Sequence, residues 1–183
     1  MTEQDAVQER EGYSFKKEFF DICETIVFSL VVLILIFLFI FRVVGVQGDS
    51  MEYTLSTGDR LIVSHLFYDP KPGDIVVVEL DEYFDTPIIK RVIAVGGQTV
   101  DIDSETGKVR VDGQELDEPY THDPTTPKSL HYPMTVPEGS VFVMGDNRAN
   151  STDGRNFGYV DKKHILGKAI FRIFPVTKIG ILS

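Results

Sequence analysis

The sequence contains a single cysteine, Cys23, which lies at the start of a long apolar run. The part of the chain after this run therefore cannot form an internal disulfide bond and offers no thiolate to a metal ion. The histidines do not supply a metal site either, since no pair has a metal-ligand spacing and no His-Glu-x-x-His motif occurs. We expect no metal and no other cofactor.

Positive charge is also scarce. The 183 residues include 18 Lys and Arg against 28 Asp and Glu, which gives a formal net charge of -10. A protein that binds a phosphate backbone needs a basic surface to displace counterions, and none is available here. Nucleic acid is therefore excluded as a partner. The length allows one soluble domain of ordinary size beside a membrane segment.

A long apolar run predicts a membrane anchor. From Thr25 to Phe41 the chain has no charged residue, and with its apolar flanks it reaches the roughly 20 residues that a bilayer-spanning helix needs. A cleavable signal peptide has a shorter apolar core followed by a small-x-small site. We therefore predict an uncleaved transmembrane anchor over residues 22–44, preceded by a polar, partly disordered tail over residues 1–21.

The basic residues near the anchor indicate its orientation. Arg10, Lys16 and Lys17 precede the apolar run Thr25–Phe41, whereas Arg42 and Arg60 are the basic residues that follow the run closely. This distribution favours a single-pass protein of the plasma membrane with a cytoplasmic N-terminus. The acidic remainder of the chain is then extracytoplasmic.

After the anchor, short runs rich in Val and Ile alternate with Gly, Pro and Asp, a pattern typical of β-strands and turns. Strands are predicted at residues 43–47, 60–68, 74–80, 88–95, 99–103, 108–113, 140–145 and 168–174. Asp112-Gly113 predicts a hairpin turn, and the Pro-rich residues 119–137 predict a loop. The fold is thus expected to be mainly β, a single N-terminal transmembrane helix followed by an all-β domain over residues 45–183 with long coil regions.

Two residues suggest catalysis. Ser50 lies in a Gly-Asp-Ser-Met turn just after the anchor, and Lys90 closes an apolar Pro-Ile-Ile run. Taken alone, Ser50 also suits a turn and Lys90 a solvated strand end. An apolar setting lowers the pKa of a lysine, however, and a neutral lysine can accept the proton of a serine hydroxyl. Together they favour a serine nucleophile with a lysine general base.

Four segments carry a family resemblance. They are GDSMEYTLSTGD at residues 48–59, PGDIVVVEL at 72–80, IIKRVIAVGGQTV at 88–100 and GDNRANSTDGRNFG at 145–158. In this order, behind a membrane span, they resemble the type I signal peptidases of bacteria. The resemblance implies a membrane-anchored serine endopeptidase that cuts N-terminal signal peptides from exported preproteins after small residues, in the Ala-x-Ala pattern. Its partners would be those signal peptides and the lipid bilayer.

The resemblance also implies residue roles. Ser50 would be the nucleophile and Lys90 the general base, Ser151 would orient the lysine, and Asp153 and Arg155 would form a supporting ion pair. The backbone N–H of the nucleophile would stabilise the oxyanion. The expected apolar substrate pocket comprises Val46, Met51, Leu55, Ile88 and Ile89. Asp146, Asn147 and Arg148 are expected to buttress their loop.

The sequence departs from the family pattern at several positions, among them Gly96-Gly97-Gln98 in the third segment, where Pro-Gly-Asp is usual. Gly48 stands where some members have a serine that donates to the oxyanion, and Gly154 where a serine is common. Tyr53 stands where proline is usual. Because proline would stiffen the turn that carries the nucleophile, we expect Tyr53→Pro to preserve or raise activity.

Two alternatives compete with this interpretation. A repressor-type Ser/Lys protease would need a DNA-binding domain, which the sequence does not show, and the anchor argues against it. The other is a catalytically weak or inactive membrane-tethered β-domain that binds exported peptides or partners. Tyr53 slightly favours this second alternative, whereas Ser50 and Lys90 favour activity.

Overall fold

The structure, a computed structural model, describes residues 3–66 and 68–182 in two units that meet at Ile40 and Phe41. Four residues of the expected elements lie outside the described residues. They are Met1 and Thr2 of the tail, Phe67 of a strand and Ser183 at the end of the domain.

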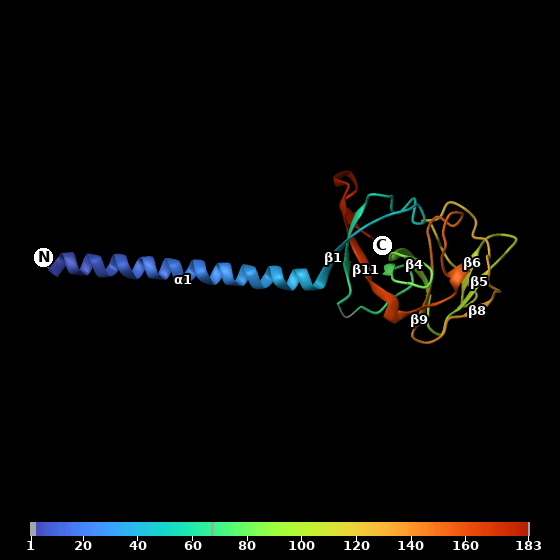
Figure 1. The fold of residues 1–183 in the computed structure, drawn as a ribbon, viewed down its shortest axis with the longest axis horizontal. Coiled ribbons are helices and arrows are strands. Elements are labelled where there is room, and N and C mark those ends of the chain that lie inside the picture. The colour runs from blue at the N-terminus through green and yellow to red at the C-terminus, as the bar shows by residue number, and fades with distance from the viewer. Residues whose placement is uncertain (1–2, 67, 183) are drawn as a thin grey trace. The chain divides into compact units, whose positions relative to one another are not determined.

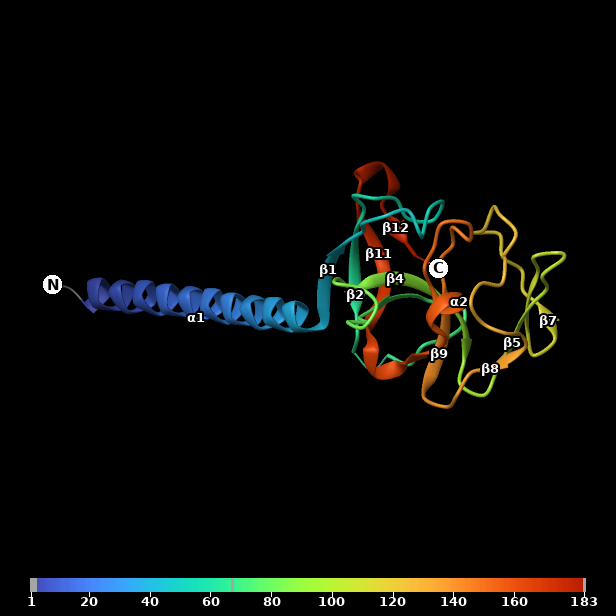
Figure 2. The same ribbon diagram turned by 45° about the vertical axis from the view of Figure 1, so that its right-hand side comes forward.

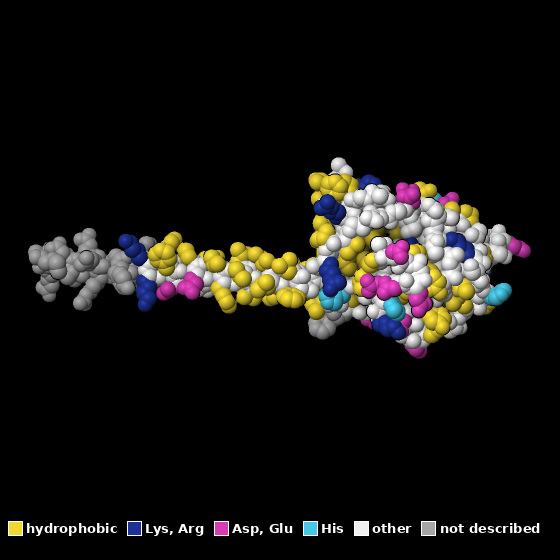
Figure 3. Space-filling model, in the orientation of Figure 1, with side chains coloured by type: hydrophobic (Ala, Val, Ile, Leu, Met, Phe, Trp, Pro, Cys, Tyr) yellow, Lys and Arg dark blue, Asp and Glu magenta, His cyan; other side chains and the backbone are white. Residues whose placement is uncertain are grey.

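The first unit is one long helix, α1 (Glu3–Ile40). Its segment Lys16–Ile40 has a mean hydropathy of 2.9 and is long enough to cross a membrane. Beyond the charged start of this segment, apolar side chains cover it (Figure 3), and Phe28 and Phe39 are 69% and 79% exposed. A helix that is apolar on all sides is stable in lipid, where its backbone groups are satisfied internally. The helix therefore fits the expected membrane anchor.

The helix differs from the expected bounds at both ends. Residues 3–21 were expected to form a partly disordered tail, but they are helical. At the other end the helix stops at Ile40, whereas the expected anchor continued to Val44. Residues 41–44 belong to β1 (Phe41–Gly45), which pairs with β2 from Phe41 opposite Ser64. Because the backbone N–H and C=O groups of residues 41–44 are used in pairing with β2, these residues cannot continue the helix.

The second unit is built on an antiparallel sheet of eight strands (Figure 1). Its order is β1, β2 (Arg60–Ser64), β11 (Ile165–Phe174), β3 (Ile75–Val78), β4 (Ile88–Val95), β9 (Ser140–Met144) and β10 (Val160–Asp161). The eighth strand, β12 (Gly180–Ile181), pairs with β11. The predicted mainly β fold is confirmed.

A smaller sheet lies beyond β9, at the end of this unit away from β1 and β2 (Figures 1 and 2). Its order is β7 (Gln114–Glu115), β6 (Val109–Val111), β5 (Thr99–Ile102) and β8 (Met134–Thr135). The turn between β6 and β7 has positive φ at Asp112 (52°) and Gly113 (78°), as its sequence predicts. The remaining elements are α2 (Gly154–Phe157) and the 3-10 helices Lys162–His164 and Val176–Lys178.

The prediction matched long strands and missed short ones. The strand expected at residues 88–95 coincides with β4. The two-residue strands β7, β8, β10 and β12 were not predicted, because two residues cannot display a periodicity. One of them, β8, lies inside the Pro-rich residues 119–137, which were expected to be loop throughout.

The centre of the large sheet is buried on both faces. In β3, Ile75 and Val77 pack into one apolar cluster with Leu55 and Leu61, while Val76 and Val78 pack into another. A strand covered on both sides needs no polar face, which explains its continuous run of apolar residues. Lys90 is the residue of β4 opposite Val76, so the fold places a lysine beside a fully buried strand.

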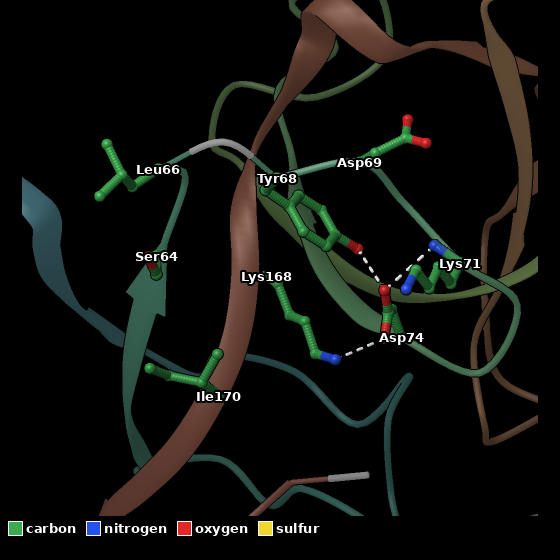
Figure 4. A pocket seen from close by; sticks show the side chains of 8 residues that line it. All are labelled: Ser64, Leu66, Tyr68, Asp69, Lys71, Asp74, Lys168 and Ile170. Carbon is green, nitrogen blue, oxygen red and sulfur yellow. Dashed lines mark hydrogen bonds and ion pairs between the residues drawn. The ribbon is translucent and has the colours of Figure 1, made fainter.

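A cavity of about 390 Å³ outside this region holds a separate polar cluster (Figure 4). The Asp74 carboxylate accepts hydrogen bonds from Tyr68 Oη at 2.8 Å, the Lys71 N–H at 3.0 Å and Lys168 Nζ at 2.5 Å. Burial raises the pKa of Asp74, but these donors outweigh burial and hold the pKa below its ordinary value. The cluster ties the β2–β3 connection to β11.

This cluster predicts a pH-dependent contribution to stability. Because the folded-state pKa of Asp74 is depressed, its contribution is present above the unfolded pKa and disappears as the pH falls through the folded one. We expect Asp74→Asn to lower the thermal midpoint at pH 7, with the deficit shrinking below about pH 4. Thermal melts of both proteins from pH 3 to 7 test this. Asp69→Asn, at an exposed carboxylate, is the matched control, and a deficit independent of pH would contradict the assignment.

Candidate active site

Ser50 lies on the nucleophile loop, residues 46–59, which connects β1 to β2. The loop is closed at its base, where the Val46 N–H donates to the Asp59 carbonyl at 2.8 Å and the Gly58 N–H to the Val46 carbonyl at 3.0 Å. Met51 and Leu55 are 2% and 0% exposed and hold the loop in the core. Burial of these two side chains leaves the neighbouring serine at the surface of a cavity.

Ser50 and Lys90 are in direct contact. Lys90 Nζ donates a hydrogen bond to Ser50 Oγ at 2.7 Å, and the lysine is only 3% exposed. Burial lowers the pKa of Lys90 to about 8, against the opposing effect of Asp153 and Asp146, whose charges favour the protonated form. A substantial neutral fraction therefore exists at mildly alkaline pH, and a neutral amine can accept the serine proton.

The cavity beside this pair has a volume of about 280 Å³. Two of the five expected pocket residues, Ile88 and Ile89, line it. Val46, Met51 and Leu55 do not line it and belong to the buried core. The sequence interpretation missed other lining residues, Gly45, Gln47, Val77 and Leu166 among them, because they come from strands and a loop that only the folded domain brings together.

The structure also brings Ser151 to this region. Its side chain is 5% exposed, and a Cβ built on Gly145 would collide with both Ser151 Oγ and the Ser50 carbonyl. The Ser151 hydroxyl lies near enough to Asp153 to favour the ionised carboxylate, but it makes no hydrogen bond in the described part of the chain. Its expected role in orienting Lys90 thus stays a prediction.

Asp153 and Arg155 form an ion pair, and both side chains are fully buried. Arg155 Nη2 and Nε contact the two carboxylate oxygens at 2.8 and 2.9 Å, and the Gly145 N–H donates to the same carboxylate at 3.0 Å. Burial raises the pKa of Asp153, but the arginine and this N–H outweigh burial and hold the pKa below its ordinary value. The carboxylate therefore stays ionised beside Lys90.

Close packing explains the glycine at position 154. A Cβ there would lie 2.7 Å from the Val143 carbonyl and 2.9 Å from the Phe142 ring. The loop after β9 approaches that strand too closely for a larger residue. In this chain, the departure from the common serine therefore reflects packing.

A second buried ion pair fastens the nucleophile loop to β4. Arg91 binds the Asp146 carboxylate through Nε at 2.9 Å and Nη2 at 2.8 Å, and Thr54 Oγ1 donates to that carboxylate at 2.5 Å. The Asn147 N–H donates to the Ser50 carbonyl at 3.1 Å. These contacts fix the separation of the nucleophile and the lysine. The sequence interpretation missed Arg91, although its place directly after Lys90 was an available signal.

Arg148 connects the loop after β9 to the start of the Pro-rich segment. It donates to the Gly145 carbonyl at 2.9 Å and pairs with Glu118 at 2.5 Å. The Tyr120 ring lies between two guanidinium groups, 4.0 Å from that of Arg91 and 6.0 Å from that of Arg148. The Pro-rich segment is therefore held against the loop that supports the candidate dyad.

Comparison with known proteins identifies the family. The model of the family described as signal peptidase, peptidase S26, matches residues 19–174. The chain belongs to the signal peptidase family. It is 40% identical over 165 residues to a probable signal peptidase I-1 of Synechocystis sp., covering 85% of this chain and 82% of that protein. It is 34% identical over 183 residues to signal peptidase I of Bacillus licheniformis, covering 93% and 97%.

A crystal structure of a signal peptidase I from Enterococcus faecalis V583 also matches. It covers 55% of this chain and 97% of its own, with 28% identity and a TM-score of 0.45. Family membership makes the protein an enzyme, a signal peptidase that hydrolyses peptide bonds.

The nucleophile loop of this signal peptidase has an unexpected conformation at Tyr53. Its φ is 61°, in the left-handed region, and its ring stacks on His122 with centroids 3.7 Å apart. The expectation that Tyr53→Pro preserves activity assumed a φ near -65°, and this assumption is wrong. Tyr53 lies inside a turn in which the Thr54 and Leu55 N–H groups both donate to the Met51 carbonyl, and no signal in the sequence indicated its positive φ.

We now expect Tyr53→Pro to lower both stability and activity. Proline cannot adopt a positive φ, so the turn must rearrange at a cost of more than about 1 kcal/mol. Tyr53→Gly is the control, because it also loses the ring but tolerates the angle. Thermal midpoint and peptide turnover are measured for both variants. Wild-type values for the proline variant would show that the loop has another conformation.

Burial of Lys90 predicts a gain in stability when it is replaced. The folded pKa of about 8 lies below the ordinary 10.5, so the cost is fully present below pH 8 and disappears as the pH approaches 10.5. That cost is on the order of 3 kcal/mol, and loss of the Ser50 hydrogen bond offsets about 1 kcal/mol of it. We expect Lys90→Met to be more stable than wild type at pH 7 but not at pH 10.5, in denaturant titrations of both proteins. A less stable variant at pH 7 would refute this.

Proposed function

We propose that this signal peptidase removes signal peptides from exported preproteins, with Ser50 as nucleophile and Lys90 as general base. The observation that carries the proposal is the 2.7 Å contact between Lys90 Nζ and Ser50 Oγ, made by a lysine that is 3% exposed. A solvated lysine would be protonated at neutral pH and unable to act as a base. A buried one with a pKa of about 8 can act as a base near physiological pH.

In the first step, neutral Lys90 accepts the hydroxyl proton of Ser50 while Oγ attacks the scissile carbonyl carbon. The negative charge moves to the carbonyl oxygen. We assign the Ser50 N–H to stabilise this oxyanion, since it donates no hydrogen bond within the described chain. The tetrahedral intermediate then collapses, the C–N bond breaks, and protonated Lys90 gives its proton to the leaving amine.

The second step releases the signal peptide. Lys90, neutral again, accepts a proton from a water molecule as the water oxygen attacks the acyl carbon of the ester. The second tetrahedral intermediate breaks the bond to Ser50 Oγ, and the proton returns to that oxygen. In each of the two steps one proton passes between Ser50 Oγ and Lys90 Nζ, so both steps use the short contact between these atoms.

The cavity beside the dyad supports cleavage after small residues of the Ala-x-Ala type. Ile88 and Ile89 give it an apolar wall that suits the methyl side chains of alanine. The helix before β1 supports anchoring of the enzyme in the plasma membrane. In the proposed orientation, the N-terminus is cytoplasmic and the domain that carries Ser50 is extracytoplasmic.

A cleavage assay tests the proposal. The detergent-solubilised full chain is incubated with a peptide containing an Ala-x-Ala site, and products are measured from pH 6 to 10. We expect cleavage after the second alanine, with a rate that rises with pH through an apparent pKa near 8, because only neutral Lys90 is competent. Ser50→Ala should abolish cleavage. Lys90→Arg should also abolish it, because guanidinium stays protonated.

Thermal melts of the two variants serve as controls for folding. Cleavage by folded Ser50→Ala would end the proposed mechanism. No cleavage by the wild type would favour the alternative of an inactive peptide-binding domain.

A further inference from the structure

Residues 126–129 of the Pro-rich segment dock directly onto the loop behind the dyad. Arg155 Nη1 donates to the Thr126 carbonyl at 3.3 Å, and the Ser129 N–H donates to the Arg155 carbonyl at 3.1 Å. Between these two contacts, Lys128 Nζ donates to the backbone carbonyl of Ser151. Three consecutive contacts therefore join this segment to residues 151–155.

Lys128 differs from the other charged groups near Lys90 because its charge is not paired with one of opposite sign among the described residues. Four charged groups influence Lys90, namely Asp153, Asp146, Arg155 and Lys128. Asp153 is paired with Arg155, and Asp146 with Arg91, so each of these charges has a partner of opposite sign. Lys128 forms no ion pair with a carboxylate in residues 3–66 and 68–182. Its positive charge near the dyad is thus not neutralised locally.

We propose that Lys128 is a positioning residue for the dyad, which holds the Ser151 backbone in place and sets an uncompensated positive charge near Lys90. The inference rests on the proposed roles of Ser50 and Lys90. It gives the Pro-rich segment a part in catalysis through a residue that touches neither substrate nor the reacting atoms.

The two effects of Lys128 have different physical consequences. Its hydrogen bond restrains the backbone at Ser151, whose side chain packs against Gly145, so its loss should loosen the site and lower kcat. Its charge repels the proton on Lys90 and helps to keep that amine neutral. Because Lys128 is exposed, this second effect should weaken as ionic strength rises.

Three substitutions in the full chain separate these effects. Lys128→Met removes both the donor and the charge, Lys128→Gln removes the charge but keeps an N–H donor on a side chain one atom shorter, and Lys128→Arg keeps both. Cleavage of the Ala-x-Ala peptide gives kcat, KM and the pH profile, and melts give the thermal midpoint. We expect the acid limb to move up by roughly 0.3 to 0.5 pH unit in the Met and Gln variants and to stay in place in the Arg variant.

The methionine variant should also lose about two- to fivefold in plateau kcat with little change in KM, since substrate does not touch Lys128. The shift of the acid limb should disappear in 1 M salt. Lys163→Met is the matched control, because it removes an equally positive side chain that is 70% exposed and paired with Asp161. It should leave the profile unchanged.

An acid limb that stays at the wild-type position in both the Met and Gln variants would overturn the inference, even if their thermal midpoints fall. This failure is distinct from failure of the proposed function. If only the inference on Lys128 fails, the wild type still cleaves the peptide and cleavage still requires Ser50. If the proposed function fails, the wild type does not cleave the peptide or cleaves it without Ser50.

Discussion

The proposed chemistry depends on one constraint, which is that the amine of Lys90 is kept out of water while it touches Ser50. Desolvation is the largest influence on this lysine, and no other ionisable group in direct contact with the serine hydroxyl competes for its proton in the described chain. The large sheet provides the dry surroundings, since β3 is buried on both faces and β4 lies beside it. A lysine at the edge of this sheet would be hydrated and protonated. The position of the strand within the sheet therefore decides the chemistry.

Buried ion pairs hold the segments around this lysine. The nucleophile loop, β4 and the loop after β9 are distant in sequence. Arg91–Asp146 joins β4 to the loop after β9, Thr54 of the nucleophile loop donates to the same carboxylate, and Asp153–Arg155 lies within the segment after β9. Burying either partner alone would leave an uncompensated charge, which costs far more than the pair contributes. Arg91–Asp146 therefore favours one arrangement of the three segments. Arg91 and Arg148 also hold the start of the Pro-rich segment, through the Tyr120 ring and through Glu118 directly before it.

The contact between Ser50 and Lys90 and the ion pair of Asp153 with Arg155 join residues that the sequence analysis had singled out. The first pair was singled out by residue type and position together with the family resemblance, the second by the resemblance alone, and their catalytic roles stay predictions. The pocket was predicted less well, because Met51 and Leu55 are apolar whether they line a cavity or fill the core. Tyr53 was misjudged because its φ of 61° and its stacking on His122, a residue distant in sequence, are features of the folded chain.

The sequence by itself determined the membrane-length helix and the mainly β fold and singled out Ser50 and Lys90, because hydrophobic period, turn residues and functional groups are local properties of the chain. The tertiary structure decided where the helix stops, since Phe41 pairs with Ser64 of β2. It also decided which apolar residues face the cavity, and it brought Lys128 to the carbonyl of Ser151. These features depend on contacts between residues far apart in sequence, and on the burial that those contacts create, which no single segment encodes.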